Sequence, residues 1–251
     1  MLLLRTTRTL LIGWLALAMA WVGWADEPPP MPDPPNPLYE KPARPSPDGI
    51  GKSFMGREIA RVMSYHGAAW LDRPEREKEE APSKLLPALK IRPGDVVADI
   101  GAGSGYYTLK LAELVGPKGK VYAVDIQDEM LQIIRRKMKK ANLTNIELVK
   151  GGEKTTNLPK SSVDLMLLVD VYHEFAYPYE MTKAMLDALK PGGRLVFVEF
   201  RLEDENVPIR LLHKMSEQQV KREMSIHPLT HVETLGHLPW QHVIIFSKKG
   251  P

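Results

Sequence analysis

From Asp95 to Phe200, apolar runs as long as β-strands alternate with amphipathic runs of helical period. Few folds accommodate this order of elements. The runs of strand character are 96–100, 121–125, 146–149, 163–171 and 194–200. The helical runs between them are 106–115, 128–138 and 179–189. Strict alternation of this kind is typical of a parallel sheet with helices on both faces. The run 163–171 is almost continuously apolar, which predicts a central strand buried on both sides.

Beyond the fifth strand, Ser216 is placed to cap a helix that extends to Met224. Two further strands, 229–235 and 242–247, are predicted to form a hairpin around Pro239. We therefore predict an α/β fold with a Rossmann-like, seven-stranded, mostly parallel sheet. Helices cover both faces of this sheet, and the last hairpin strand is antiparallel.

Residues 51–84 are predicted to form an amino-terminal helical lid segment. A helix from Gly56 to His66 is indicated by side chains at helical spacing, which are Ile59, Val62, Met63 and His66. Ser83 is placed to cap a later helix. The side chains expected near the mouth of a site are Tyr65, His66, Trp70 and Arg73. For His66, packing of the helix against the sheet edge is the alternative.

The first 25 residues have the pattern of a secretory signal peptide. Arg5 and Arg8 precede an apolar run from Leu10 to Trp24, and small residues permit cleavage after Ala25. The alternative is an uncleaved anchor, because the run is only slightly short for a membrane span. Both interpretations place the rest of the chain outside the cytoplasm, and we expect a periplasmic protein.

A later start of translation would change this expectation. Translation from Met31 or Met55 would remove the leader and give a cytoplasmic protein.

Residues 26–50 contain ten prolines, which predicts an extended, solvated linker without a core.

The composition excludes several kinds of site and partner. Cysteine is absent, which excludes disulfides, thiolate nucleophiles and cysteine-ligated zinc. The net charge is +3, and removing Arg5 and Arg8 leaves +1, so no nucleic-acid partner is expected, and no membrane contact beyond an uncleaved anchor. The basic run Arg135–Lys140 is interpreted as a solvated helix end rather than an RNA site, because no aromatic side chains accompany it.

A glycine-rich turn follows the first strand, with Gly101, Gly103 and Gly105 at G-x-G-x-G spacing. Glycines in such a turn let the backbone approach a ligand closely. A dinucleotide-binding turn has the spacing G-x-G-x-x-G, and Tyr106 stands where its last glycine would fall. The carboxylate of Asp99 would also repel a pyrophosphate, whereas it suits a ligand that carries an ammonium and a sulfonium.

Asp125 ends the second strand, where an acidic side chain is well placed to accept both hydroxyls of a ribose. With Asp99, the glycine turn and the Leu189–Gly193 turn before the fifth strand, the sequence resembles the class I S-adenosylmethionine-dependent methyltransferases. It is similar in particular to their ubiquinone/menaquinone-biosynthesis-like branch, from about residue 85 to 248. The resemblance implies a methyltransferase domain over 85–251 and S-adenosyl-L-methionine as cofactor.

The same resemblance implies a set of cofactor contacts. They are Asp99 towards the amino group, Gly101, Gly103 and Gly105 along the methionine and ribose, Asp125 on the ribose, Ile126 on the adenine, and Glu153. Family members often have a Gly-Asp pair where this chain reads Gly151-Gly152-Glu153. Glu153 is therefore a displaced substitute for the adenine contact or an exposed loop acid.

Asp170 and His173 follow the central strand and are the candidate catalytic residues, because ligands bind at the carboxyl ends of strands in open α/β sheets. Methyl transfer needs mainly positioning, plus a base where the acceptor carries a proton. His173 is predicted to be that base, with a packed, hydrogen-bonded role as the alternative, and Glu174 is expected to orient a neighbour. No metal site is expected, because no second histidine follows His173 at i+4.

The sequence thus predicts S-adenosylmethionine-dependent methyl transfer to a small-molecule acceptor. An Asn/Asp-Pro-Pro-Tyr signature, associated with amino-group methylation of bases or glutamine, is missing after the central strand. This disfavours nucleic-acid and protein acceptors. Two other classes stay open, which are a nicotinamide-dependent oxidoreductase and an exported, non-catalytic binding module on the same fold.

Overall fold

The computed structural model describes residues 38–250. The predicted signal peptide and the first part of the predicted linker lie outside the described residues. Within the described range, no helix has both the length and the apolar character needed to cross a membrane.

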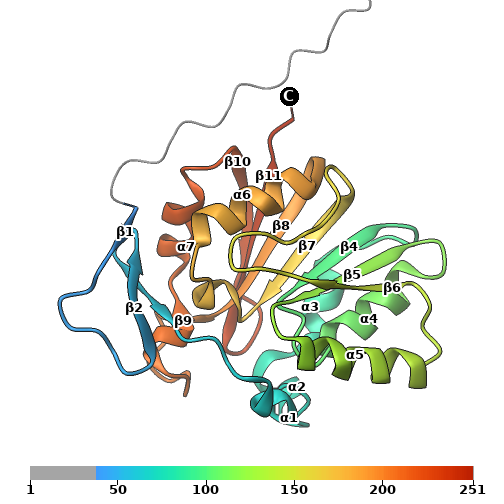
Figure 1. Ribbon diagram of the computed structural model, residues 1–251, viewed down its shortest axis with the longest axis horizontal. Helices are drawn as coiled ribbons and strands as arrows, with labels where there is room; N and C mark the ends of the chain where they lie inside the picture. Colours follow the sequence, from blue (N-terminus) through green and yellow to red (C-terminus); the bar gives the residue numbers. More distant parts are fainter. Residues whose placement is uncertain (1–37, 251) are drawn as a thin grey trace, which may run out of the picture. The chain divides into compact units, whose positions relative to one another are not determined.

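The main sheet has the strand order β10-β11-β8-β7-β4-β5-β6 (Figure 1). Its strands are β4 (Val96–Ile100), β5 (Lys120–Asp125), β6 (Ile146–Lys150), β7 (Val163–Val169), β8 (Leu189–Arg201), β10 (Leu229–Leu235) and β11 (Gln241–Lys248). Neighbours from β6 to β8 are parallel, whereas β11 is antiparallel to both β8 and β10. A two-residue strand, β9 (Lys214–Met215), pairs with β8 beside this path. The predicted mostly parallel sheet with an antiparallel last strand is confirmed.

Helices cover the sheet on both faces (Figure 1). One face carries α3 (Pro82–Ala88), α4 (Tyr106–Val115) and α5 (Asp128–Lys140), and the other carries α6 (Pro178–Ala188) and α7 (Glu217–Met224). In β7, Leu165 and Leu167 join the core under α3 and α4, while Met166 and Leu168 join the core under α6 and α7. All four side chains are buried, as predicted for a central parallel strand.

A small three-stranded sheet precedes the main one, formed by β1 (Tyr39–Glu40), β2 (Gly49–Phe54) and β3 (Arg57–Ala60). The predicted helix from Gly56 to His66 is therefore wrong. Met55 and Gly56 have positive φ angles of 48° and 89° and join β2 to β3 as a two-residue hairpin turn. The apolar spacing resembled that of a helix, but Ile59 packs with Phe54 in the core of this hairpin.

The hairpin also changes the interpretation of the flanking segments. The prediction of a coreless linker is wrong for its last residues, because Leu38 is buried and β1 pairs with β2. After β3 come three short helices, η1 (Tyr65–Gly67), α1 (Ala68–Leu71) and α2 (Arg76–Glu80). The segment 51–84 is thus part strand and part helix.

Helix caps were predicted with mixed success. Ser216 caps α7 as expected, because its side chain accepts a hydrogen bond from the backbone N–H of Gln219. Ser83 does not cap α3, since it lies inside the helix behind Ala81, which has a left-handed conformation. For α5, Asp128 is the first helical residue and makes no cap hydrogen bond. Its negative charge still suits the amino-terminal end of the helix dipole.

Candidate active site

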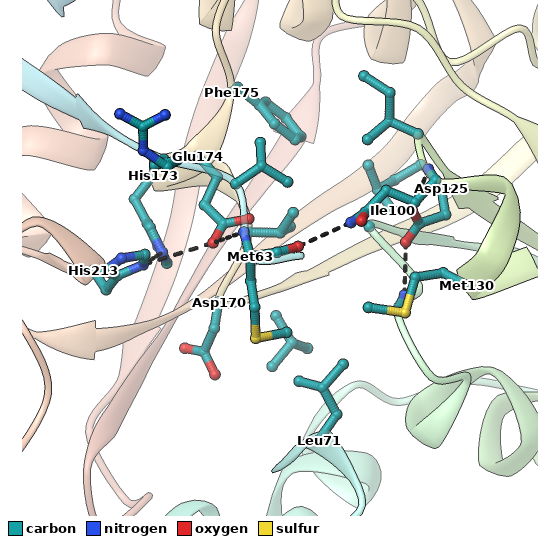
Figure 2. A pocket seen from close by; sticks show the side chains of 18 of the residues that line it. Met63, Leu71, Ile100, Asp125, Met130, Asp170, His173, Glu174, Phe175 and His213 are labelled. Atoms are coloured by element: carbon teal, nitrogen blue, oxygen red, sulfur yellow. Dashed lines mark hydrogen bonds and ion pairs between the residues drawn. The ribbon is translucent and has the colours of Figure 1, made fainter. Parts of the chain in front are cut away.

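A cavity of about 620 Å³ opens at the carboxyl ends of the parallel strands. It lies where the strand order reverses, with β4, β5 and β6 on one side and β7 and β8 on the other. Ligands bind at such a switch point in open α/β sheets. Figure 2 shows Asp125 and Met130 on one side of the cavity and His173, Glu174 and His213 on the other.

The glycine turn forms one wall of the cavity, where Gly101 and Gly103 both lie. A Cβ atom at Gly101 would overlap Cγ2 of Val171, and one at Gly103 would lie 2.6 Å from Cδ1 of Leu71. Both glycines have positive φ angles, of 69° and 53°. Glycine is therefore required for the turn to pass this close to its neighbours.

Asp125 links the turn to the end of β5. Its Oδ2 accepts a hydrogen bond of 2.8 Å from the N–H of Gly103, and its Oδ1 accepts one of 2.8 Å from the N–H of Gln127. Burial raises the pKa of Asp125, although these backbone hydrogen bonds act in the opposite direction. Each carboxylate oxygen keeps a second lone pair that a ligand hydroxyl can use.

Two further predicted contacts line the same end of the cavity. Ile126 is 39% exposed, so an apolar surface beside Asp125 is available to a flat ring. Glu153 follows β6 with Gly151 and Gly152, and it is an exposed side chain at the edge of the cavity. Both belong to the ligand-facing surface.

Asp99 is not among the residues that line the cavity. Its side chain is buried beneath the turn, where Oδ2 accepts a hydrogen bond of 2.5 Å from Oγ1 of Thr108. Burial raises the pKa of Asp99 to about 6. Gly105 is also absent from the cavity wall. It is the N-cap residue of α4, with a φ angle of 80°, and a Cβ atom there would lie 2.8 Å from Cγ1 of Ile134. Both residues shape the turn from behind.

Asp170 lines the cavity directly after β7, in a strained backbone conformation with a φ angle of 50°. Its Oδ2 accepts a hydrogen bond of 2.7 Å from Nε2 of Gln241. Its Oδ1 is buried and has no hydrogen-bond partner among the described residues. Burial, and then the negative charges of Glu80 and Glu199, raise the pKa of Asp170 well above its ordinary value. The surroundings of Asp170 thus disfavour its charged form.

His173 lies in η2 (Tyr172–Glu174) and is part of a buried polar cluster. Its Nδ1 donates a hydrogen bond of 2.6 Å to Oε2 of Glu199, which projects from β8. Its Nε2 lies 3.0 Å from Nδ1 of His213, at the end of η3 (Leu211–His213). Oε1 of Glu174 lies 3.6 Å from the same Nδ1 and accepts a hydrogen bond from the N–H of Met63.

The pKa values of the side chains in this cluster are shifted in different directions. Burial lowers the pKa of His173, but the carboxylate of Glu199 outweighs it and leaves the pKa above its ordinary value. Burial, and then His173, lower the pKa of His213 to about 4. Burial raises the pKa of Glu174 to about 7. His173 is therefore the imidazole of this pair that holds a proton more readily.

The amino-terminal segment covers part of the cavity with Met63, Trp70 and Leu71. Gln127 ties this segment to the sheet, since its Nε2 donates to the carbonyl of Met63 and its Oε1 accepts from the N–H of Tyr65. Of the side chains predicted at the mouth, Trp70 lines the cavity, whereas the three that do not are Tyr65, His66 and Arg73.

Four side chains at the site were not among the site residues predicted from the sequence. They are Met63, Gln127, Glu199 and His213. Glu199 lies in a predicted strand between apolar neighbours. A buried acid needs a polar partner, so its position in this strand could have indicated a functional contact. His213 lies in a loop between elements and carries no comparable signal.

Comparison with known proteins gives the family. A family model described as a methyltransferase domain matches residues 91–242, which is more than half of the chain. The chain belongs to this methyltransferase family. The match begins after α3 and ends within β11, so it includes every strand end around the cavity.

Individual relatives of this methyltransferase match over part of their length. The ubiquinone/menaquinone biosynthesis C-methyltransferase UbiE of Ectopseudomonas mendocina is 35% identical over 111 residues, which cover 44% of this chain and 43% of the relative. A protein-L-isoaspartate O-methyltransferase of Aeropyrum pernix is 34% identical over 150 residues, which cover 56% of this chain and 55% of the relative. The chain thus spans about half the length of these curated relatives.

A solved structure agrees over a larger region. The SAM-dependent methyltransferase from Aquifex aeolicus is 26% identical, with a TM-score of 0.71, and the match covers 74% of this chain and all of that one. The Rossmann-like α/β fold of this methyltransferase domain is therefore shown both by its own strand order and by a known relative.

Proposed function

We propose that this protein transfers a methyl group from S-adenosylmethionine to a small-molecule acceptor. The observation that carries the proposal is one cavity with two chemically different ends. One end has the glycine turn and Asp125, and the other has the buried His173 cluster.

The first end fits the cofactor named by the structural relative. Asp125 retains lone pairs for ribose hydroxyls, and Ile126, Met130 and Val124 offer apolar surface for an adenine. Gly101 lets the backbone lie close to a ligand. When bound, the cofactor supplies an electrophilic methyl group on a sulfonium.

The second end fits an acceptor of limited size. Phe175, Met181 and Ile209 are apolar side chains of the cavity wall, while Asp170 and His173 are polar groups of the same wall. A cavity of about 620 Å³ suits small molecules, whose sites are mostly apolar with few placed polar groups. His173 acts as the base towards the acceptor, and Asp170 offers a second polar group in the same cavity.

Titration calorimetry of the full chain with S-adenosylmethionine tests the cofactor. We expect micromolar binding by the wild type and by the control Asp187→Ala, whose side chain is exposed on α6. Asp125→Ala should bind at least tenfold more weakly, because two ribose hydrogen bonds are lost. No binding by the folded wild type would contradict the proposal. Binding without transfer of a labelled methyl group to any acceptor would favour the non-catalytic binding module.

We also propose that the protein is exported to the periplasm with removal of residues 1–25. The charged start and the apolar run of this leader support the proposal. A start at Met55 is disfavoured, because it would remove β1 and all of β2, including the buried side chain of Phe54. Mass spectrometry of the protein from separated cell compartments tests this. A periplasmic product that begins at Asp26 supports export, and a cytoplasmic product that begins at Met31 contradicts it.

We further propose that residues 51–84 act as a lid on the methyltransferase domain, which begins near residue 85. Met63, Trp70 and Leu71 support this, because all three line the cavity from outside the matched family region. Binding of adenosylmethionine should slow backbone amide hydrogen exchange at Met63 and Tyr65. Unchanged exchange rates in this segment would contradict a lid role.

A further inference from the structure

We propose that His173, Glu174 and His213 bind a divalent transition-metal ion at the acceptor end of the cavity. Each residue offers one donor atom, and these atoms all lie within 4.8 Å of one another. All three residues line the cavity (Figure 2). Ion binding itself does not depend on the proposed function, whereas its link to the acceptor does.

The distances between donor atoms are compatible with a shared ion. Nε2 of His173 is 3.0 Å from Nδ1 of His213, and this Nδ1 is 3.6 Å from Oε1 of Glu174. Atoms that bind one ion at about 2.1 Å lie roughly 3 to 3.5 Å apart. A hydrogen bond accounts for the first distance only, because 3.6 Å is too long for one.

The surroundings of His173 resemble those of a metal-bound histidine. Its Nδ1 donates to Oε2 of Glu199, and the other oxygen of Glu199 accepts from the N–H of Tyr172 at 3.1 Å. Metal-binding histidines commonly donate their second N–H to a carboxylate, which fixes the ring and directs the free nitrogen at the ion. Glu174 is also held in place, by the N–H of Met63.

The charges around the cluster favour a dication. Glu174 and Glu199 are both buried, and burial of carboxylates is costly without a compensating positive charge. The guanidinium of Arg57 donates to both oxygens of Glu223 and to the carbonyl of His173, and not to either of these carboxylates. An ion of charge +2 would balance the two carboxylates.

The donor set selects the kind of ion. Two imidazole nitrogens and one carboxylate favour transition metals such as Zn²⁺ or Co²⁺ over Mg²⁺ or Ca²⁺, which prefer oxygen ligands. Three protein ligands leave at least one coordination position open towards the cavity. The proposed acceptor is therefore a molecule with an oxygen donor. With the ion bound, Nε2 of His173 would be a ligand rather than a base, and the ion would polarise the acceptor oxygen.

Equilibrium dialysis of the full chain, purified without a histidine tag, against Zn²⁺ tests the proposal. The wild type should bind about one equivalent, and so should the control His231→Gln, an exposed histidine on β10. His213→Gln and Glu174→Gln should each bind at least tenfold more weakly. Visible absorption bands of a Co²⁺-loaded sample should disappear in the same two variants. The near-native far-UV circular dichroism of each variant confirms folding.

Two results would overturn the proposal. They are a wild type that binds no Zn²⁺ above the background of a histidine-free protein, and variants His213→Gln and Glu174→Gln that bind as well as His231→Gln. Calorimetry with S-adenosylmethionine separates this outcome from failure of the proposed function. His213→Gln should keep its cofactor affinity, because His213 lies at the opposite end of the cavity from Asp125 (Figure 2).

Discussion

Nδ1 of His173 and Oε2 of Glu199 form a buried hydrogen bond of 2.6 Å between residues 26 positions apart in the chain. Glu199 lies in β8 and His173 follows β7, and these two strands are parallel neighbours. The hydrogen bond places the proton of a neutral His173 on Nδ1 and leaves the lone pair of Nε2 facing Nδ1 of His213. The pair therefore determines which ring nitrogen is available for chemistry.

Glu199→Gln should change the tautomer of His173. In the metal-free wild type we expect Nδ1 to carry the proton, since a carboxylate is a stronger acceptor than an amide. In the variant, a measurable share of molecules should carry it on Nε2 instead. Ring ¹⁵N chemical shifts of histidine-labelled protein report this directly. Glu233→Gln on β10 is the control, and an Nε2-protonated wild type would contradict the prediction.

Gly101→Ala should destabilise the protein more than Gly192→Ala. Both glycines have positive φ angles, of 69° and 73°, but only at Gly101 does a Cβ meet a neighbour, Cγ2 of Val171. The backbone cost is about 1–2 kcal/mol at either site, and overlap adds about 1–3 kcal/mol at Gly101. Urea unfolding measures both. The double variant Gly101→Ala/Val171→Ala should recover part of the loss, and equal losses in the two single variants would refute the steric explanation.

Asp99→Asn should remove a pH dependence of stability. Burial raises the pKa of Asp99 to about 6, whereas that of an unfolded aspartate is near 4. Between these values the folded protein binds more protons, so its free energy of unfolding falls as pH rises from about 4 to about 6 and then levels. The variant should gain up to about 3 kcal/mol relative to the wild type at pH 7. Urea unfolding at pH 4.5, 5.5 and 7 tests this, with the exposed Asp187→Asn as control.

Asp170→Asn should leave stability at pH 7 within about 0.5 kcal/mol of the wild type or raise it. Burial and nearby acids disfavour a negative charge on Asp170 and raise its pKa, so an uncharged amide suits the same site. An asparagine oxygen can still accept from Nε2 of Gln241, and asparagine tolerates a positive φ angle. Asp170→Ala should instead cost about 1–3 kcal/mol, because it leaves the buried amide of Gln241 unpaired. A large loss for Asp170→Asn in thermal unfolding would mean that the group is ionised.

Sequence reasoning succeeded where the structure depends on local pattern. The strand Val96–Ile100 and the helix Tyr106–Val115 were predicted with the bounds that the structure has. Apolar alternation and glycine act over a few residues, so the strand, the turn and the helix after it are visible in the chain itself. The same reasoning failed between Gly56 and His66, because a hairpin core imitated helical spacing.

The residues that line the cavity were predicted only in part. Gly101, Gly103 and Asp125 line the cavity as expected, and so do four more of the predicted residues, which are Ile126, Glu153, Asp170 and His173. Asp99 and Gly105 support the turn from behind instead. Sequence position places a residue at a strand end but does not determine the direction in which its side chain points once the turn folds over it.

By itself, the sequence determined the α/β fold, the turn after β4 and the carboxylate at the end of β5, because each follows from periodicity or residue type within a short stretch. Only the tertiary structure decided the surroundings of His173. Glu199 and His213 reach it across 26 and 40 residues of chain, because β8 lies beside β7 and the segment after β8 returns over the strand ends. Contacts of this kind depend on the order of the strands in the sheet, which is determined by packing and not by any short stretch of sequence.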